Sequence, residues 1–482
     1  MRPRAAGLFV FALIAGAEVI ACSGPPQQSA NALLPMGRTA SGSTPIAHVI
    51  VVIQENRSFD NLFATFPGAD GATTGQAEAV PPSLQSQCPI PKATTVPLQP
   101  HDLVVGDDFD HSYQGGYLID LDGGKMDGFD LSVIPGGSGK LNCLRPYQYV
   151  NPQQIKPYWD LASQYVLADQ TFQTQGSGTF TAHQDLIAGG TMVDANDTVI
   201  DNPTYFPWGC DSRSSTVTSL ITTSGQYLQN QGPFPCFTYQ TLRDLLDARH
   251  VAWKYYAMAV QKPSACKGKG GDTAGIWSAF DAIQAVRYGP EWRKNVTKTN
   301  TVFFKDVSSG KLPAVSWITP DAINSDHPQE QKRAQCQPGH GPDLDTGPSW
   351  VASIVNAVGE SKYWNSSAIV ILWDDWGGFY DHESPAFFDN MGGLGFRVPM
   401  LIVSPYVQAH VEHTQYEYGS ILKFVENNWN LGSLHTTDDR AASIANAFDF
   451  NQQPRQFQPI GSKYSRSYFL HQKPSGVVPD SQ

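Results

Sequence analysis

A continuous apolar run that stops on two adjacent carboxylates constrains the fold of this chain more than any other stretch. Residues 368–373 read AIVILW, and Asp374 and Asp375 follow directly. An unbroken apolar run of this length is typical of a strand buried on both faces, as in a parallel sheet. Ligands of open α/β sheets bind at the carboxyl ends of the strands, and paired acids there need a cation. We therefore interpret Asp374 and Asp375 as metal ligands, the alternative being a solvated turn.

A second apolar run, near the N-terminus, ends in the same way. Residues 47–53 read AHVIVVI, and Glu55 and Asn56 follow after one glutamine. The two runs together predict one cluster of hard oxygen ligands built from distant parts of the chain. Such ligands favour a single Ca²⁺ or Mg²⁺ ion, with Zn²⁺ as the alternative. The other interpretation of Asn56 is a glycosylation sequon, because Arg57 and Ser58 complete the N-x-S pattern.

Hydroxyl side chains gather in a glycine-rich turn between a predicted strand and a predicted helix. Residues 164–169 have the composition of a strand, and the turn at residues 175–179, QGSGT, precedes a segment that continues apolar from Leu186. The N-terminus of a helix favours an anion, so this junction is a candidate for binding a negatively charged group. The alternative role of Thr179 is a helix cap, which is common for threonine.

Three motifs carry a family resemblance. ENRSFD at residues 55–60, WDDWGGFYDH at 373–382 and GFRVPMLIVSPY at 395–406 resemble the phosphoesterase family, which includes bacterial phospholipases C and a related acid phosphatase. The resemblance extends from about His48 to about Phe448. It implies an alkaline-phosphatase-like α/β fold, with a doubly wound, mostly parallel sheet, helices on both faces and long loop insertions.

The resemblance also implies a hydroxyl nucleophile in the glycine-rich turn. Thr179 fits that position best, and Ser177 and Thr181 lie two residues away on either side. Coordination of the threonine oxygen by a metal ion would activate it for attack. The expected ligands of one divalent ion all offer oxygen: Glu55, Asn56, Thr179, Asp374 and Asp375.

Two histidines are expected to stabilise phosphate charge or to protonate the leaving group. His111 lies among acidic residues that would raise its pKa, and the alternative is a surface histidine held by Asp108 or Asp110. His327 directly follows a strand predicted over residues 313–320. Because His340 lies in an apparent insertion nearby, the sequence leaves open which of the two faces the phosphate, and we prefer His327.

These observations together predict an exported, metal-dependent phosphoesterase. Its substrate would be a phospholipid, as for a phospholipase C, or a small phosphate ester, as for an acid phosphatase. The net charge of −12 argues against nucleic acid as a partner, since a phosphate backbone requires a basic surface. The alternative from another class is a non-catalytic envelope lipoprotein that binds a phosphorylated ligand on the same fold. The presence of every expected ligand and of the hydroxyl favours the enzyme.

The N-terminus has the pattern of a lipoprotein signal peptide, with a basic start and an apolar segment that ends in VIAC, where Cys22 would carry the lipid. We predict a signal peptide at residues 1–21, a flexible tether at 22–44, a catalytic domain at 45–450, and a tail at 451–482 that is packed on the surface or loose. The protein would then be lipid-anchored at a membrane surface of the bacterial cell envelope, periplasmic or extracellular.

The cysteines fit an exported protein. Without Cys22 six remain, an even number that suits disulfides in an oxidising compartment. No pair has CxxC spacing, so a zinc site of thiolates is not expected. Cys210 and Cys236, which flank one polar loop, are the most plausible disulfide pair.

Overall fold

The structure, a computed structural model, describes residues 43–104, 108–134, 139–260, 275–328, 345–386 and 393–475. Cys22, Cys266, Cys336 and His340 lie outside these ranges. Within them, no helix combines the length and the apolar composition needed to cross a bilayer.

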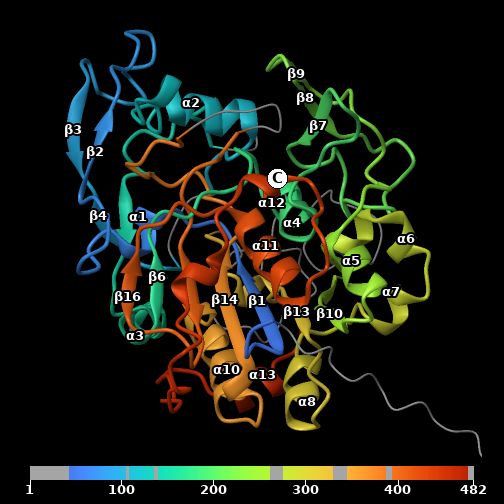
Figure 1. Ribbon diagram of the computed structural model, residues 1–482. Coiled ribbons are helices and arrows are strands. Elements are labelled where there is room, and N and C mark those ends of the chain that lie inside the picture. The colour runs from blue at the N-terminus through green and yellow to red at the C-terminus, as the bar shows by residue number, and fades with distance from the viewer. Residues whose placement is uncertain are drawn as a thin grey trace, which may run out of the picture. The chain divides into compact units, whose positions relative to one another are not determined.

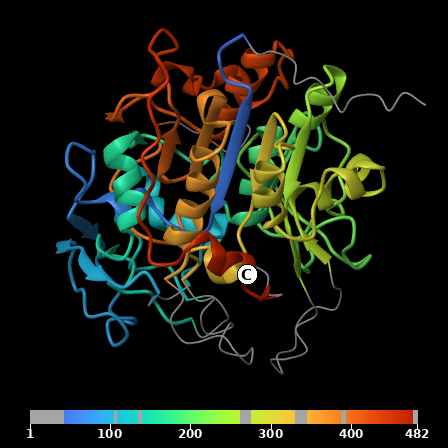
Figure 2. The same cartoon turned by 90° about the horizontal axis from the view of Figure 1, so that it is seen from below.

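A seven-stranded sheet forms the centre of the fold, in the order β10–β13–β1–β14–β15–β6–β16 (Figure 1). Its strands are β1 (His48–Gln54), β6 (Val166–Ala168), β10 (Trp253–Tyr256), β13 (Val315–Ile318), β14 (Ser367–Trp373), β15 (Met400–Val403) and β16 (His410–Glu412). Figure 2 shows β1 in blue between β14 in orange and β13 in yellow. Of the seven strands, β15 runs antiparallel to both of its neighbours, while the others share one direction. The sheet is therefore mostly parallel, as the sequence predicts.

The two apolar runs of the sequence become the adjacent strands β1 and β14. Every residue of both strands is buried, which agrees with their lack of alternating polar positions. They pair in parallel from His48 opposite Ser367 to Gln54 opposite Trp373. Because the register is in step, the residues that follow the two strands emerge side by side at one edge of the sheet.

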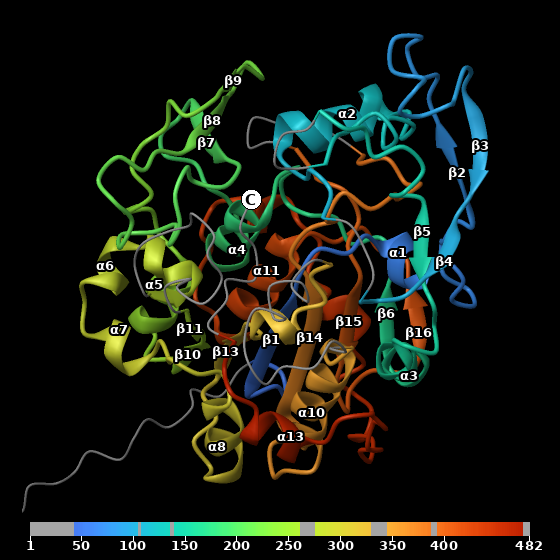
Figure 3. The ribbon, with the colours of Figure 1, turned by 180° about the vertical axis from the view of Figure 1, so that it is seen from behind.

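Helices cover both faces of the sheet. One layer contains α3 (Lys156–Gln164), α8 (Val302–Ser308), α10 (Gly347–Gly359) and α13 (Arg466–His471), and the other contains α4 (Thr179–Ala188), α5 (Leu242–Ala248), α11 (Tyr418–Trp429) and α12 (Thr437–Arg440) (Figures 1 and 3). Trp350 of α10 packs against the ring of Phe304 in α8, 5.5 Å between centroids. On the other face, the indole of Trp317 in β13 donates to the carbonyl of Leu186 in α4 at 3.2 Å.

The loop insertions carry short elements of their own. The further strands are β2 (Thr74–Ala77), β3 (Thr94–Pro97), β4 (Gln99–His101), β5 (Gln148–Val150), β7 (Asp197–Ile200), β8 (Ser219–Thr222), β9 (Tyr227–Leu228), β11 (Met258–Val260) and β12 (Gly275–Trp277). The further α-helices are α1 (Phe59–Phe63), α2 (Leu118–Leu121), α6 (Gln284–Arg287) and α7 (Glu291–Lys294). Strands β7, β8 and β9 form a three-stranded antiparallel sheet.

Two disulfides fasten these insertions. Cys210 pairs with Cys236, which confirms the pairing predicted from the sequence. Cys88 pairs with Cys143, a connection that spans 55 residues and that sequence alone could not select among the possible pairings.

The described part of the C-terminal tail packs on the sheet-flanking helices. The ring of Phe457 lies 4.9 Å from that of Trp364, and Ile460 is buried. Further along, Phe469 packs against Trp350 at 5.3 Å between ring centroids. For residues 451–475 the packed alternative, not the loose one, therefore describes the tail.

Candidate active site

Strands β1 and β14 deliver four buried polar residues to the same edge of the sheet. Glu55 and Asn56 follow β1, and Asp374 and Asp375 follow β14. The backbone amides of Asn56 and Asp375 both donate to Asp374 Oδ1, at 3.0 and 2.8 Å. The solvated-turn alternative for the two aspartates is wrong, because neither is exposed to solvent.

A glycine allows the two loops to approach each other. Gly377 has a φ of 61°, and a Cβ at this position would lie 2.6 Å from the carbonyl oxygen of Asn56. Any other side chain would therefore separate the loop after β14 from the loop after β1. Asn56 itself has a φ of 57°, a left-handed conformation that asparagine tolerates better than most residues.

Helix α4 brings two more side chains to this edge. Gly178 is the N-cap residue and Thr179 is the first residue of the helix, so the helix-cap alternative for Thr179 is wrong. The Thr179 hydroxyl donates to Asp375 Oδ2 at 3.2 Å, and it is buried. His183 lies one helical turn further on the same face, because residues four apart in a helix are neighbours.

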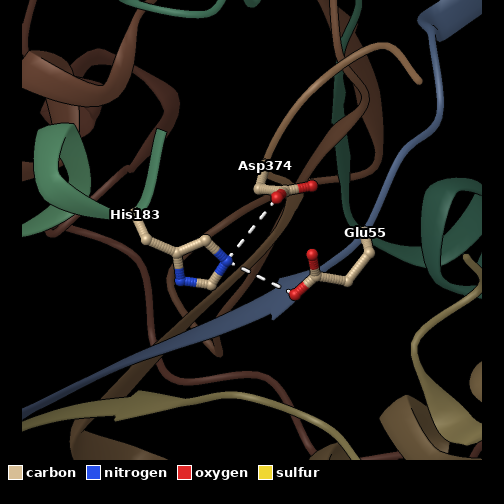
Figure 4. A group of neighbouring side chains, drawn as sticks. All are labelled: Glu55, His183 and Asp374. Atoms are coloured by element: carbon tan, nitrogen blue, oxygen red, sulfur yellow. Dashed lines mark ion pairs between the residues drawn. The ribbon is translucent and has the colours of Figure 1, made fainter. Parts of the chain in front are cut away.

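His183 completes a cluster with two of the carboxylates, as Figure 4 shows. Its Nε2 lies 3.3 Å from Glu55 Oε1 and 3.5 Å from Asp374 Oδ2. One ligand atom from each of the three residues lies within 4.8 Å of the others, and all three side chains are buried. Sequence reasoning did not assign His183, although its spacing of four from Thr179 on a predicted helix was the signal that could have found it.

The electrostatics of this cluster call for a cation. Burial, reinforced by repulsion from Asp374, raises the pKa of Glu55 well above its usual range. Burial alone would lower the pKa of His183, but Tyr255, Glu55 and Asp374 raise it well above its usual range. Within the described residues, Glu55 Oε2 and Asn56 Oδ1 are buried without a hydrogen-bond partner. Buried carboxylate and amide oxygens in this state are suited to a metal ion.

His111 lies inside the site, so the surface alternative for this histidine is wrong. Its ring is buried, and its Nδ1 must donate to the carbonyl oxygen of Phe109 at 2.8 Å, because a carbonyl only accepts. In the neutral ring Nε2 then accepts from the side-chain amide of Asn56 at 3.1 Å, and it lies 3.8 Å from Asp375 Oδ2. This contact turns the amide nitrogen of Asn56 towards His111 and leaves its oxygen for another ligand.

His327 is buried on a segment that runs beside Glu55, after the 3₁₀ turn η4 (Ala322–Asn324). The Glu55 amide donates to the carbonyl of Ser325 at 2.8 Å, so this segment lies along the same edge of the sheet. His327 is not a member of the Glu55–His183–Asp374 cluster. Its role at the phosphate stays a prediction, and His340 lies outside the described residues.

Several other motif residues form a second, largely buried group next to the site. Arg397 Nε donates to Asp381 Oδ1 at 2.8 Å, and His382 Nδ1 lies 2.7 Å from Asp60 Oδ2. The Phe59 amide donates to the carbonyl of Arg397 at 3.2 Å. These contacts join α1, the segment after β14 and the segment that leads into β15, so these motif residues hold the site's loops together.

Comparison with known proteins identifies the chain. The phosphoesterase family model matches residues 46–432, which is most of the sequence. The chain belongs to the phosphoesterase family. As a member of that family it is a hydrolase of phosphoric esters, and the family predicted from the sequence motifs is confirmed.

Several relatives of this phosphoesterase are phospholipases C. Phospholipase C A of Mycobacterium tuberculosis is 24% identical over 465 residues, covering 86% of this chain and 79% of the relative. Non-specific phospholipase C6 of Arabidopsis thaliana is 23% identical over 482 residues, covering 89% of this chain and 78% of the relative. Among solved structures, an alkaline phosphatase superfamily protein from Vibrio parahaemolyticus aligns with a TM-score of 0.32 at 9% identity, over 57% of this chain and 60% of that protein.

Proposed function

We propose that this phosphoesterase is exported, depends on a divalent metal ion, and cleaves its substrate with Thr179 as the nucleophile. The observation that carries the proposal is the contact of 3.2 Å between Thr179 Oγ1 and Asp375 Oδ2, beside the buried Glu55–His183–Asp374 cluster. A hydroxyl at the first residue of a helix, hydrogen-bonded to a carboxylate and surrounded by further acids, is suited to attack on phosphorus.

The donor groups fit one divalent ion. Glu55, Asp374 and His183 would hold it from one side, and Asn56, Asp375 and Thr179 are the further candidates. A bound ion would favour the alkoxide of Thr179 and neutralise charge on the phosphoryl oxygens. Ca²⁺ or Mg²⁺ was favoured because all the expected ligands offered oxygen. His183 offers a nitrogen, and imidazole also suits Zn²⁺. Reloading metal-free protein with each ion separately distinguishes them.

The protein's own residues supply the proton transfers. Thr179 gives its proton to Asp375 as its oxygen forms a bond to phosphorus, and the ester bond to the leaving alcohol breaks. His327 would protonate that alcohol. His111 Nε2 lies 3.8 Å from Asp375 Oδ2 and accepts from the Asn56 amide, so His111 would position Asn56 beside the reacting groups. Water then attacks the phosphothreonine and gives its proton to His327, while Asp375 returns its proton to Thr179 as the bond to phosphorus breaks, which releases the phosphate product and restores the hydroxyl.

The names of the relatives support a phospholipid or a small phosphate ester as substrate. The non-catalytic alternative, a lipoprotein that only binds such a ligand, is disfavoured, because ligand binding alone would not require a buried hydroxyl–carboxylate pair. The net charge of −12 argues against nucleic acid as a substrate or partner.

Export rests on the N-terminal pattern and on the two disulfides, which form and persist in oxidising compartments. We expect residues 1–21 to be removed and Cys22 to carry the lipid that places the enzyme at a membrane surface. The checking measurement is the intact mass and N-terminal sequence of protein from a Gram-negative host, with palmitate labelling. A mature chain that begins at another residue contradicts lipidation.

Replacement of the nucleophile tests the proposal. We expect Thr179→Ala to lower kcat by roughly 10³-fold or more with 4-nitrophenyl phosphate and with phosphatidylcholine, while Thr179→Ser keeps substantial activity. Rapid quenching with labelled substrate should give a phosphorylated peptide containing Thr179.

Neighbouring hydroxyls provide matched controls. Thr181 Oγ1 donates to the Gly178 carbonyl at 3.1 Å, and Ser177 Oγ accepts from the Asp201 amide at 2.8 Å, so both have structural partners. Thr181→Ala and Ser177→Ala should be far milder. If Thr179→Ala keeps wild-type turnover in folded protein, a water molecule is the attacking group and the covalent mechanism fails.

A further inference from the structure

A polar pocket of about 180 Å³ opens beside the nucleophile. Its inner wall contains His111 and Gly178, the residue before Thr179, and its outer wall comes from the β7–β9 sheet, which Figure 1 shows in green above α4. A Cβ at Gly178 would lie 3.2 Å from the ring of His111, so the glycine keeps this side of the pocket open towards the catalytic turn. The reaction described above uses only the inner wall.

The outer wall is tied to the nucleophile turn by hydrogen bonds. Asp201 Oδ1 accepts from the Tyr113 amide at 2.6 Å, and its Oδ2 accepts from the Tyr227 hydroxyl at 2.8 Å. The side-chain oxygen of Asn202 accepts from the Phe180 amide at 2.9 Å. A group bound against this wall would therefore be held in a fixed position relative to Thr179.

The lining determines what the pocket can accept. Its described residues include no lysine or arginine, and their titratable members are Asp201, His111 and Tyr227. An anionic group in this pocket would be repelled by the Asp201 carboxylate, and the lining has no lysine or arginine to offset that repulsion. The lining side chains are polar throughout, so burial of an acyl chain would leave their hydrogen-bonding groups unsatisfied.

The volume sets the size of the occupant. A space of about 180 Å³ corresponds to roughly six water molecules at about 30 Å³ each. That is enough for a short alcohol such as glycerol or choline.

We propose that this pocket binds the small hydrophilic substituent of a phosphodiester substrate, and that it selects a substituent without negative charge. The proposal rests on the proposed function and makes it more specific, since it assigns the enzyme a diester substrate. In a phospholipid the occupant would be the head group, which stays on phosphorus when the bond to the lipid glycerol breaks. Asp201, Asn202 and Tyr227 would then be specificity-determining residues.

The test compares four substrates that share the 4-nitrophenolate leaving group. Three are 4-nitrophenyl phosphodiesters of choline, glycerol and glycolate, and the fourth is 4-nitrophenyl phosphate, which lacks a second substituent. For the wild type, we expect a kcat/KM at least about tenfold higher for the choline and glycerol esters than for the anionic glycolate ester. The ratio of the choline to the glycerol ester separates a cationic from a neutral occupant.

An exposed lining residue offers a variant outside the catalytic machinery. Gln229→Trp should fill the pocket and lower kcat/KM for the choline and glycerol esters by about tenfold, since overpacking is costly, while 4-nitrophenyl phosphate changes less than about twofold. Gln226→Trp, on the same hairpin but outside the pocket, is the matched control and should leave all four substrates unchanged.

The outcomes separate the two proposals. Loss of wild-type activity on every ester contradicts the proposed function, and with it this inference. Wild-type activity that Gln229→Trp reduces equally for the monoester and the diesters, or not at all, overturns the pocket assignment alone. A preference for the glycolate ester overturns the charge selection.

Discussion

Asn56 illustrates how one position is fixed by both its backbone and its side chain. Its amide binds Asp374, its side-chain nitrogen binds His111, and its left-handed φ of 57° turns the chain sharply after β1. Because the residue is fully buried, it cannot be glycosylated in the folded protein, so the sequon interpretation is wrong. The side-chain oxygen that remains without a hydrogen-bond partner among the described residues is the one we assign to the metal ion.

The ligand role of His183 can be tested by metal content. We expect His183→Ala to weaken metal binding by roughly 10–100-fold, because it removes the one nitrogen donor of the Glu55–His183–Asp374 cluster. The measurement is metal occupancy by elemental analysis after dialysis against a buffered ion, with circular dichroism to verify folding. His413→Ala is the control, since this exposed histidine pairs with Asp169 away from the cluster. Wild-type occupancy in His183→Ala would exclude a ligand role.

The candidate site residues could be predicted from the sequence where they follow the end of a strand. Glu55 and Asp374 follow unbroken apolar runs, so the sequence places them at a sheet edge without knowledge of the partner strands. His183 was not assigned, because its role depends on the rotational phase of α4, which only its spacing of four from Thr179 indicates. The contacts of the His111 ring likewise depend on a turn, and a turn has no periodic pattern of apolar residues from which it could be predicted.

At the scale of elements, a buried ion-pair group determines how three segments meet. Burial opposes the charged ring of His382, but its hydrogen bond and attraction to Asp60 outweigh this and raise its pKa to about 9. Burial raises the pKa of Asp381 to about 6, against the attraction of Arg397. The protonated ring of His382 thus helps to neutralise the acids that link α1 to the loop after β14.

This pKa shift predicts a pH dependence of stability. The pKa of His382 rises from about 6.5 in the unfolded chain to about 9 in the folded one. Its stabilising contribution is therefore complete below about pH 6.5 and is lost as the pH rises to about 9. We expect the wild-type Tm to fall over this range by on the order of 1–3 °C more than that of His382→Gln. Equal slopes for wild type and variant in calorimetry at closely spaced pH values would contradict the assignment.

An apolar pattern in the sequence does not determine the direction of a strand, as β15 shows. The sequence predicts a central strand at residues 400–404, and the structure has β15 at Met400–Val403. Its antiparallel pairing with β14 and β6 was not predictable, because hydrophobicity indicates burial but not strand direction. Just before β15, Arg397 contacts Asp381, which lies in the segment that follows β14.

For the whole molecule, the α/β class and the mostly parallel sheet were predictable, because helices and apolar strands alternate along the chain. The packing of the C-terminal tail was less predictable than the fold class, because the composition of the tail is polar and proline-rich. Ile460 and Phe469 contribute to this packing, since both are buried against the rest of the fold. Near the end of the described chain, the Ser475 amide donates to Asp321 at 2.8 Å, beside the turn that precedes His327.

The pairing of β1 with β14 also affects when the enzyme gains activity during synthesis. The hydrogen bond between Asn56 and Asp374 closes a separation of 318 residues. A growing polypeptide that already contains Thr179 still lacks Asp374 and Asp375, and such long-range parallel contacts form slowly. Incomplete chains therefore carry the proposed nucleophile without the carboxylates proposed to activate it. On the proposed mechanism, a ribosome that stalls before β14 releases a fragment that cannot hydrolyse phosphate esters.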